Sequence, residues 1–135
     1  MDLETLKEFA KKYTAAWCSQ DASRVASFFA ENGSLKINDG SPAVGRAAIT
    51  EAAQGFMTAF PDLTVTMDDL EGEGDNFVYR WTLTGTNTGY GGSGKRVRIS
   101  GYEEWTLDAN GRISSSLGHF DEEEYQRQLK SGAMP

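Results

Sequence analysis

The fold is decided by the stretch FVYRWTLTGTNTGYGGSGKRVRISGYEEWTLDANGRISSSLGHFD, which covers residues 77–121. Apolar and polar residues alternate in three runs, which are separated by a glycine-rich segment (86–95) and by the turn-forming residues 108–111. Side chains of a strand point to opposite sides at every other residue, so the alternation predicts strands over 77–83, 96–107 and 112–120. The turn segments between them predict hairpins and therefore antiparallel pairing.

Helical patterns occupy much of the chain before this stretch. Apolar residues recur at three- and four-residue steps over 2–19 and 45–60, which predicts two helices, and a shorter helix containing Val25, Phe28 and Phe29 is expected from Asp21. Short strands are expected over 34–38 and 63–67, and a final helix over 121–129. This order indicates an α+β fold with helices on one face of a bent sheet. The length of 135 residues fits a single domain over 1–135.

The composition is that of an ordinary folded domain, with 39% hydrophobic and 24% charged residues. The net charge of −7 repels phosphate backbones and anionic lipids, which disfavours nucleic acid and membrane surfaces as partners. One histidine and one cysteine cannot build a His- or Cys-rich metal site, so no metal is expected.

Cys18 is the single cysteine, so no intrachain disulfide can form. It lies in a helical pattern beside Trp17, where a buried and unreactive thiol is expected. The sequence shows neither a charged-then-apolar leader nor an apolar run near 18 residues. A cytoplasmic location is therefore expected.

Alternation also predicts which residues of the strands face the interior. The odd-numbered positions carry most of the apolar residues, and Glu103, His119 and Asp121 share this parity. Ionisable groups in an apolar interior are usually paired, neutral or functional, because an unpaired buried charge is costly. A carboxyl among aromatic rings would have a raised pKa, and a carboxylate two residues from an imidazole could orient it for proton transfer.

Structural roles are open for the same residues. Asp121, with Glu124 three residues later, fits a capping box at the start of the final helix. His119 fits a hydrogen-bonded structural histidine, and a β-bulge could turn Glu103 to solvent. Tyr13 lies on the apolar stripe of the first helix, where a core tyrosine with a satisfied hydroxyl is the alternative to a role in the site.

Two runs in the middle of the chain, RWTLTGTNTG (80–89) and GKRVRISG (94–101), resemble the SnoaL-like polyketide cyclase family. This family belongs to the nuclear transport factor 2-like superfamily. The closing segment 111–121 and the N-terminal pattern 13–21 extend the resemblance over nearly the whole chain.

The resemblance implies a cone-shaped curved antiparallel sheet wrapped around N-terminal helices, a cystatin-like α+β roll with a deep pocket. It also implies a homodimer and chemistry without a cofactor. In such cyclases an aspartate at the end of the last strand acts as general acid and base in an intramolecular aldol closure, and Asp121 matches that position.

Steroid isomerases of the same superfamily pair a tyrosine with a protonated carboxylic acid as an oxyanion hole. Tyr13 and Glu103 fall at these positions, whereas the catalytic base of those enzymes falls near Ile37. Leu117 stands where the last strand of the SnoaL-like family usually carries a tryptophan.

We therefore expect a cofactor-free acid/base enzyme that acts on a small hydrophobic carbonyl compound. Asp121 would be the acid/base with His119 as its partner, and Glu103 and Tyr13 would donate hydrogen bonds to a developing oxyanion. The expected apolar lining consists of Trp17, Phe56, Tyr79, Trp81, Trp105 and Leu117. The alternatives are a module of the same fold for ligand binding or dimerisation, and an epoxide or lactone hydrolase.

Overall fold

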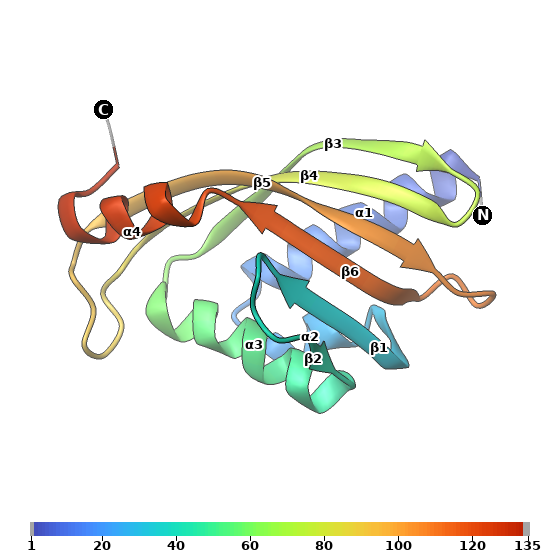
Figure 1. Ribbon diagram of the computed structural model, residues 1–135, viewed down its shortest axis with the longest axis horizontal. Helices are drawn as coiled ribbons and strands as arrows, with labels where there is room; N and C mark the ends of the chain where they lie inside the picture. Colours follow the sequence, from blue (N-terminus) through green and yellow to red (C-terminus); the bar gives the residue numbers. More distant parts are fainter. Residues whose placement is uncertain (1, 134–135) are drawn as a thin grey trace.

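The computed structural model describes residues 2–133, and its elements follow the expected order (Figure 1). The helices described are α1 (Leu3–Cys18), α2 (Ala22–Ala26), α3 (Arg46–Ala59) and α4 (Glu122–Ser131). The strands described are β1 (Phe29–Ile37), β2 (Ala43–Val44), β3 (Thr64–Glu73), β4 (Asn76–Thr86), β5 (Arg96–Leu107) and β6 (Ile113–Phe120).

The strands form one sheet in the order β2-β1-β6-β5-β4-β3. Neighbouring strands are antiparallel except β1 and β6, which are parallel, so the expected all-antiparallel sheet is corrected at this one pair. Figure 1 shows strands β3–β6 curving over α1, with α3 below the sheet and α4 at one end. The expected curved α+β architecture is confirmed.

The sequence of α1 explains where this helix begins and which of its faces is buried. The Asp2 side chain caps it by accepting a hydrogen bond from the Thr5 N–H at 2.8 Å. Leu6, Ala10 and Tyr13 follow at helical spacing and are fully buried against the sheet. Burial of this stripe places the Tyr13 hydroxyl inside the curve of the sheet.

Strand β1 begins earlier than the sequence suggested. Phe29 was expected in the second helix, but α2 ends at Ala26 and Phe29 pairs with Ile113 of β6. The register of β1 shifts between Phe29 and Ser34, and a Cβ atom at Gly33 would lie 2.8 Å from the Ile113 carbonyl oxygen. The absence of a side chain at Gly33 allows β1 and β6 to approach closely.

A bulge in β6 changes the direction of every later side chain in that strand. Thr106 pairs with Ser115, but Leu107 pairs with Ile113, so one extra residue is accommodated in β6. Beyond the bulge the even positions face inward. The prediction that the odd positions face inward is therefore wrong for Leu117, His119 and Asp121, because the extra residue reverses the parity.

Cys18 is exposed, which corrects the expectation of a buried thiol. Its sulfur donates to the Val65 carbonyl oxygen and accepts from the Val65 N–H at 3.3 and 3.2 Å, because α1 ends beside the edge strand β3. Within residues 2–133, no helix combines the length and apolar character needed to cross a membrane.

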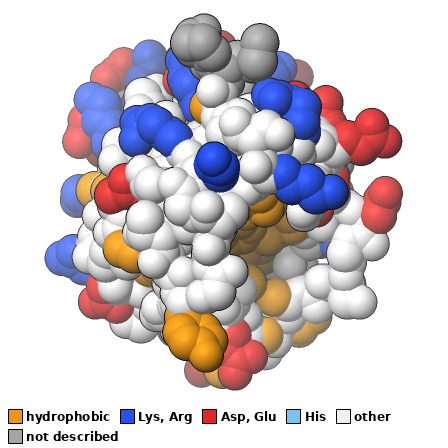
Figure 2. All heavy atoms as spheres, turned by 90° about the vertical axis from the view of Figure 1, so that its left-hand side faces the viewer, with side chains coloured by type: hydrophobic (Ala, Val, Ile, Leu, Met, Phe, Trp, Pro, Cys, Tyr) orange, Lys and Arg blue, Asp and Glu red, His pale blue; other side chains and the backbone are white. Residues whose placement is uncertain are grey.

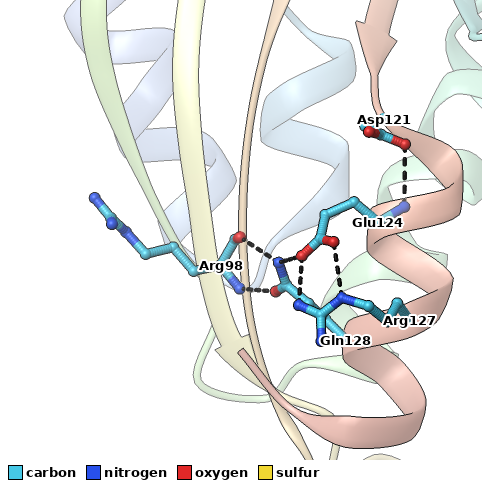
Figure 3. A network of polar contacts seen from close by, with 5 residues as sticks. All are labelled: Arg98, Asp121, Glu124, Arg127 and Gln128. Carbon is cyan, nitrogen blue, oxygen red and sulfur yellow. Dashed lines mark hydrogen bonds and ion pairs between the residues drawn. The ribbon is translucent and has the colours of Figure 1, made fainter. Parts of the chain in front are cut away.

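A side chain of helix α4 attaches the helix to β5 by bonding to strand backbone that has no neighbouring strand. Strand β6 pairs with β5 only from Gly101 to Leu107, which leaves the earlier residues of β5 without a strand on that side. Gln128 is buried there: its amide nitrogen donates to the Arg98 carbonyl oxygen at 3.0 Å, and its amide oxygen accepts from the Arg98 N–H at 2.6 Å (Figure 3). This pair of hydrogen bonds fixes α4 at the end of the cone.

The rest of the network in Figure 3 holds Gln128 in this position. Glu124 accepts hydrogen bonds from Gln128 at 2.7 Å and from Arg127 at 2.8 and 2.6 Å. Asp121 caps the helix by accepting from the Glu124 N–H at 3.0 Å. The expected cap at Asp121 is confirmed, although among the described residues no side chain bonds to the Asp121 N–H to complete a capping box.

We predict that Gln128→Ala lowers the free energy of unfolding by about 1–3 kcal/mol, because it leaves partly buried backbone groups of Arg98 without partners. Gln126→Ala is the matched control, since Gln126 is exposed and bonds only to Glu122 in its own helix. Urea unfolding of both variants measures the difference. Equal losses would contradict the proposed attachment of α4.

Candidate functional site

A cavity lies between the concave face of the sheet and the helices, with a volume of about 70 Å³. Six of its lining residues are aromatic, and the others are aliphatic apart from Glu103 and Gly118. The lining consists of Trp17, Leu35, Ile37, Phe56, Val65, Tyr79, Trp81, Leu83, Ile99, Glu103, Gly118, Phe120 and Tyr125. The cavity therefore offers an apolar, ring-rich surface with a single carboxyl group among the described residues.

The cavity opens into an outer hollow, with which it shares Ile37, Phe56, Phe120 and Tyr125. The outer hollow lies between α3 and α4 and is bordered by the turn that follows β1. Figure 2 shows a hollow with hydrophobic side chains on its floor at this end of the molecule. A ligand could thus reach the cavity past α4.

Glu103 is the central polar residue of the cavity. It lies in β5 opposite Tyr79 of β4 and Gly118 of β6, and only 7% of its surface is exposed. Its Oε1 atom accepts three hydrogen bonds, from Ser116 Oγ at 2.7 Å, Tyr13 Oη at 2.9 Å and Trp105 Nε1 at 3.1 Å. Three donors around one oxygen hold the carboxyl in a fixed orientation.

The second oxygen of Glu103 is in a different situation. Among the described residues, no donor bonds to Oε2, although Glu103 lines the cavity. A Cβ atom at Gly118 would lie 3.9 Å from Glu103 Cγ, so the absent side chain leaves space beside the carboxyl. The free oxygen is therefore the one that a ligand in the cavity would meet.

Burial raises the pKa of Glu103 above its ordinary value of 4.5, because the charged form loses its hydration. The hydrogen bonds from Ser116, Trp105 and Tyr13 act in the opposite direction by stabilising the carboxylate. Burial also raises the pKa of Tyr13 well above 10, so this hydroxyl remains a donor at neutral pH. The net effect is a raised pKa, so Glu103 keeps its proton to a higher pH than an exposed glutamate does.

Aromatic packing explains how the cavity keeps its shape. The Tyr79 ring stacks on Trp105 with centroids 4.8 Å apart, and Tyr13 meets Trp105 edge-to-face at 5.2 Å. Trp81 lies over Gly101 of β5, where a Cβ atom would come within 2.7 Å of the Trp81 ring. The Trp81 Nε1 atom is buried and has no hydrogen-bond partner among the described residues.

The structure brings together part of the predicted site. Glu103 and Tyr13 meet at hydrogen-bond distance, and Trp17, Phe56, Tyr79 and Trp81 line the cavity. Trp105 is buried behind Glu103 and contributes its N–H rather than a lining surface.

The three remaining predicted residues lie outside the cavity because of the bulge in β6. Leu117 is 41% exposed on the outer face of the sheet. His119 is on the same face, where its Nε2 lies 2.8 Å from Glu104 Oε2 and its ring stacks on Tyr102. Asp121 is exposed at the start of α4. The geometry therefore gives the acid/base pair expected at Asp121 and His119 no contact with the cavity.

Residues that the sequence analysis missed take their places. Ser116 and Gly118 are the inward residues of β6 next to Glu103, and Phe120 and Tyr125 close the cavity from the side of α4. The three consecutive serines at 114–116 carry no apolar alternation, so the bulge within them has no signal in the pattern. Among residues 2–133, no three His, Cys, Asp or Glu side chains gather where they could hold a metal ion.

The raised pKa of Glu103 predicts how stability depends on pH. The folded state binds this proton more tightly than the unfolded state, so the stabilisation is present below about pH 4.5 and is lost as pH rises through the raised pKa. The difference in the free energy of unfolding between the wild type and Glu103→Gln should therefore fall as the pH rises from about 4.5 through the raised pKa. One titrating group limits the slope to about 1.4 kcal/mol per pH unit.

Chemical unfolding at several pH values measures this difference. Glu51→Gln is the control, because Glu51 is exposed on α3 and makes no side-chain hydrogen bond among the described residues. A difference between wild type and Glu103→Gln that stays constant from pH 4 to 8 would show that Glu103 does not titrate abnormally.

Comparisons with known proteins show which proteins this chain is similar to. No curated protein matches the chain. Among solved structures, AclR from Streptomyces galilaeus is 22% identical with a TM-score of 0.80, covering 99% of this chain and 87% of its own. TsrD from Streptomyces laurentii is 21% identical with a TM-score of 0.82, covering 96% of this chain and 97% of its own.

The epoxide hydrolase/cyclase-like enzyme SalBIII, which has a role in pyran ring formation in the polyether salinomycin, is also similar. It is 22% identical with a TM-score of 0.78, and the match covers 91% of this chain and 95% of SalBIII. These likenesses show the fold. The family model of the SnoaL-like polyketide cyclases matches residues 7–129, so the chain belongs to the SnoaL-like polyketide cyclase family.

Proposed function

We propose that the protein is a cofactor-free acid/base enzyme that acts on a small hydrophobic carbonyl compound in the aromatic cavity. The observation that carries this proposal is the buried Glu103 carboxyl, which has one oxygen held by three donors and the other free on the cavity side. In this proposal Glu103 takes the acid/base role that the sequence analysis gave to Asp121.

The proposed chemistry begins with removal of a proton from the carbon next to the carbonyl group. Glu103 Oε2 takes the proton, and the electron pair of the C–H bond moves through the carbon skeleton onto the carbonyl oxygen as an enolate. If the compound has a carbon–carbon double bond beside the carbon that loses the proton, return of the proton to the far carbon of that double bond gives an isomer. Alternatively, the enolate carbon attacks a second carbonyl of the same molecule, which closes a ring, and Glu103 returns the proton to the new alkoxide.

The surroundings of Glu103 support this role. A general base works best when its pKa lies near the working pH, and burial moves the pKa of Glu103 in that direction. Tyr13, Ser116 and Trp105 orient the carboxyl through Oε1 and do not compete for Oε2.

Family membership supports the ring-closing form of this chemistry, since the family is that of polyketide cyclases. SalBIII, which has a similar fold, is an epoxide hydrolase/cyclase-like enzyme with a role in pyran ring formation, and this likeness supports the same form of the chemistry. The expected homodimer and cytoplasmic location stay predictions.

The test does not require the natural substrate. Small cyclic ketones are incubated with the protein in D₂O, and NMR follows the replacement of protons beside the carbonyl by deuterium. We predict catalysed exchange by the wild type and a loss of at least about 100-fold in Glu103→Gln, the usual scale of general acid–base catalysis. The exchange rate should rise with pH through the raised pKa of Glu103, because the base must be deprotonated.

Three control variants separate Glu103 from the residues on the outer face. Glu104→Gln, His119→Ala and Asp121→Asn should retain exchange, because these side chains lie outside the cavity. Loss of exchange in Asp121→Asn with full activity in Glu103→Gln would overturn the assignment. Binding of ketones without any exchange would indicate a binding module.

Gly118 gives a prediction about substrate size. A Cβ atom there would meet neighbours only at 3.5–4.0 Å, so Gly118→Ala should fold normally while filling space beside Glu103. We predict slower exchange for the larger ketones of the series and little change for the smallest. Gly55→Ala is the control, because it adds the same methyl group in the outer hollow, with no neighbour within 4 Å. An unchanged size preference in Gly118→Ala would contradict the position assigned to the reacting end of the ligand.

A further inference from the structure

The cavity combines two features that neutral ligands do not use fully. Six of its lining residues are aromatic: Trp17, Phe56, Tyr79, Trp81, Phe120 and Tyr125. Among the described residues that line it, Glu103 is the one acid, and none is Lys, Arg or His. A carboxyl group therefore lies among aromatic side chains, with no Lys, Arg or His beside it in the described lining of the cavity.

Such a surface is complementary to an organic cation. Aromatic faces carry partial negative charge and attract ammonium groups, and the attraction increases where water is excluded. The methyl groups of a substituted ammonium also bury apolar area against the rings, as a neutral ligand of the same shape would. Unlike that neutral ligand, the cation is also attracted electrostatically to the rings and to the free oxygen of Glu103.

We propose that the cavity binds small methylated ammonium ions, with the cationic head among the aromatic rings and opposite Glu103 Oε2. This binding activity goes beyond the acid/base reaction proposed above, because it requires the charge and the rings but no proton transfer. It predicts that such ions compete with carbonyl compounds for the same space.

The outer hollow, through which a ligand would reach the cavity, also has acidic and no basic residues in its described lining. The acidic residues are Asp39 and Glu122. The Lys and Arg side chains above the hollow in Figure 2 belong to neither lining, and Arg127 of α4 is paired with Glu124 at 2.6 Å. The whole chain carries a net charge of −7, which attracts cations over a longer range.

A matched pair of ligands tests the proposal. Choline and 3,3-dimethyl-1-butanol have the same shape, but the first carries a quaternary nitrogen where the second carries a carbon. Calorimetric titration of the wild-type protein gives the dissociation constant of each. We expect choline to bind at least about tenfold more tightly, and indole N–H signals in NMR spectra to shift, because Trp17 and Trp81 line the cavity.

Two variants test whether the preference for choline arises in the cavity. Glu103→Gln should remove most of the preference for choline and leave the affinity for the alcohol nearly unchanged, whereas Glu104→Gln, on the outer face, should bind as the wild type does. Equal affinities of the wild type for the two ligands, or no binding of choline, would overturn the proposal even if Glu103→Gln fails to fold. Proton exchange in ketones is measured in a separate experiment. Failure of choline to bind would therefore not contradict the proposed acid/base function.

Discussion

The site depends on one interaction, the convergence of three donors on a single oxygen of Glu103. Tyr13 reaches it from α1, Trp105 from the same strand and Ser116 from β6, at 2.7–3.1 Å. Burying a carboxyl is unfavourable, and these bonds offset part of that cost. They do so on one side of the group only. The fold thereby holds a carboxyl rigidly while leaving its other oxygen available inside an apolar cavity.

The sequence was sufficient to predict the part of this arrangement that depends on regular periodicity. Helical spacing placed Tyr13 on a buried stripe, and alternation placed Glu103 and Trp105 on the concave face of β5; both hold in the structure. The same rule failed in β6, because it assumes an unbroken register and the strand contains an extra residue. Because of this bulge, His119 and Asp121 lie outside the cavity, Gly118 lines it, and Ser116 bonds to Glu103. Such an insertion leaves no mark in a run of three serines.

The wall of the cavity on the side of α4 could not be predicted from local pattern, because it depends on contacts between distant segments. Strand β5 is longer than its β6 partner, and the amide of Gln128 pairs with the uncovered backbone of Arg98. This anchors α4, and α4 carries Tyr125 to the cavity wall. A glutamine in a charged helix reads as a solvent-exposed residue in sequence. Its burial arises only after the unequal lengths of two strands create an unpaired edge.

The asymmetry around Glu103 is also what distinguishes a functional role from a structural one. A glutamine at position 103 could accept the same three hydrogen bonds through its amide oxygen and would avoid the cost of burying a charge. It would, however, present an NH₂ group to the cavity, which can neither take up a proton nor attract a cation. The carboxyl is thus the choice that packing alone does not favour. Under the proposed function, its advantage lies in what the free oxygen can do toward a ligand, and the apolar, ring-lined cavity around it strengthens every such interaction.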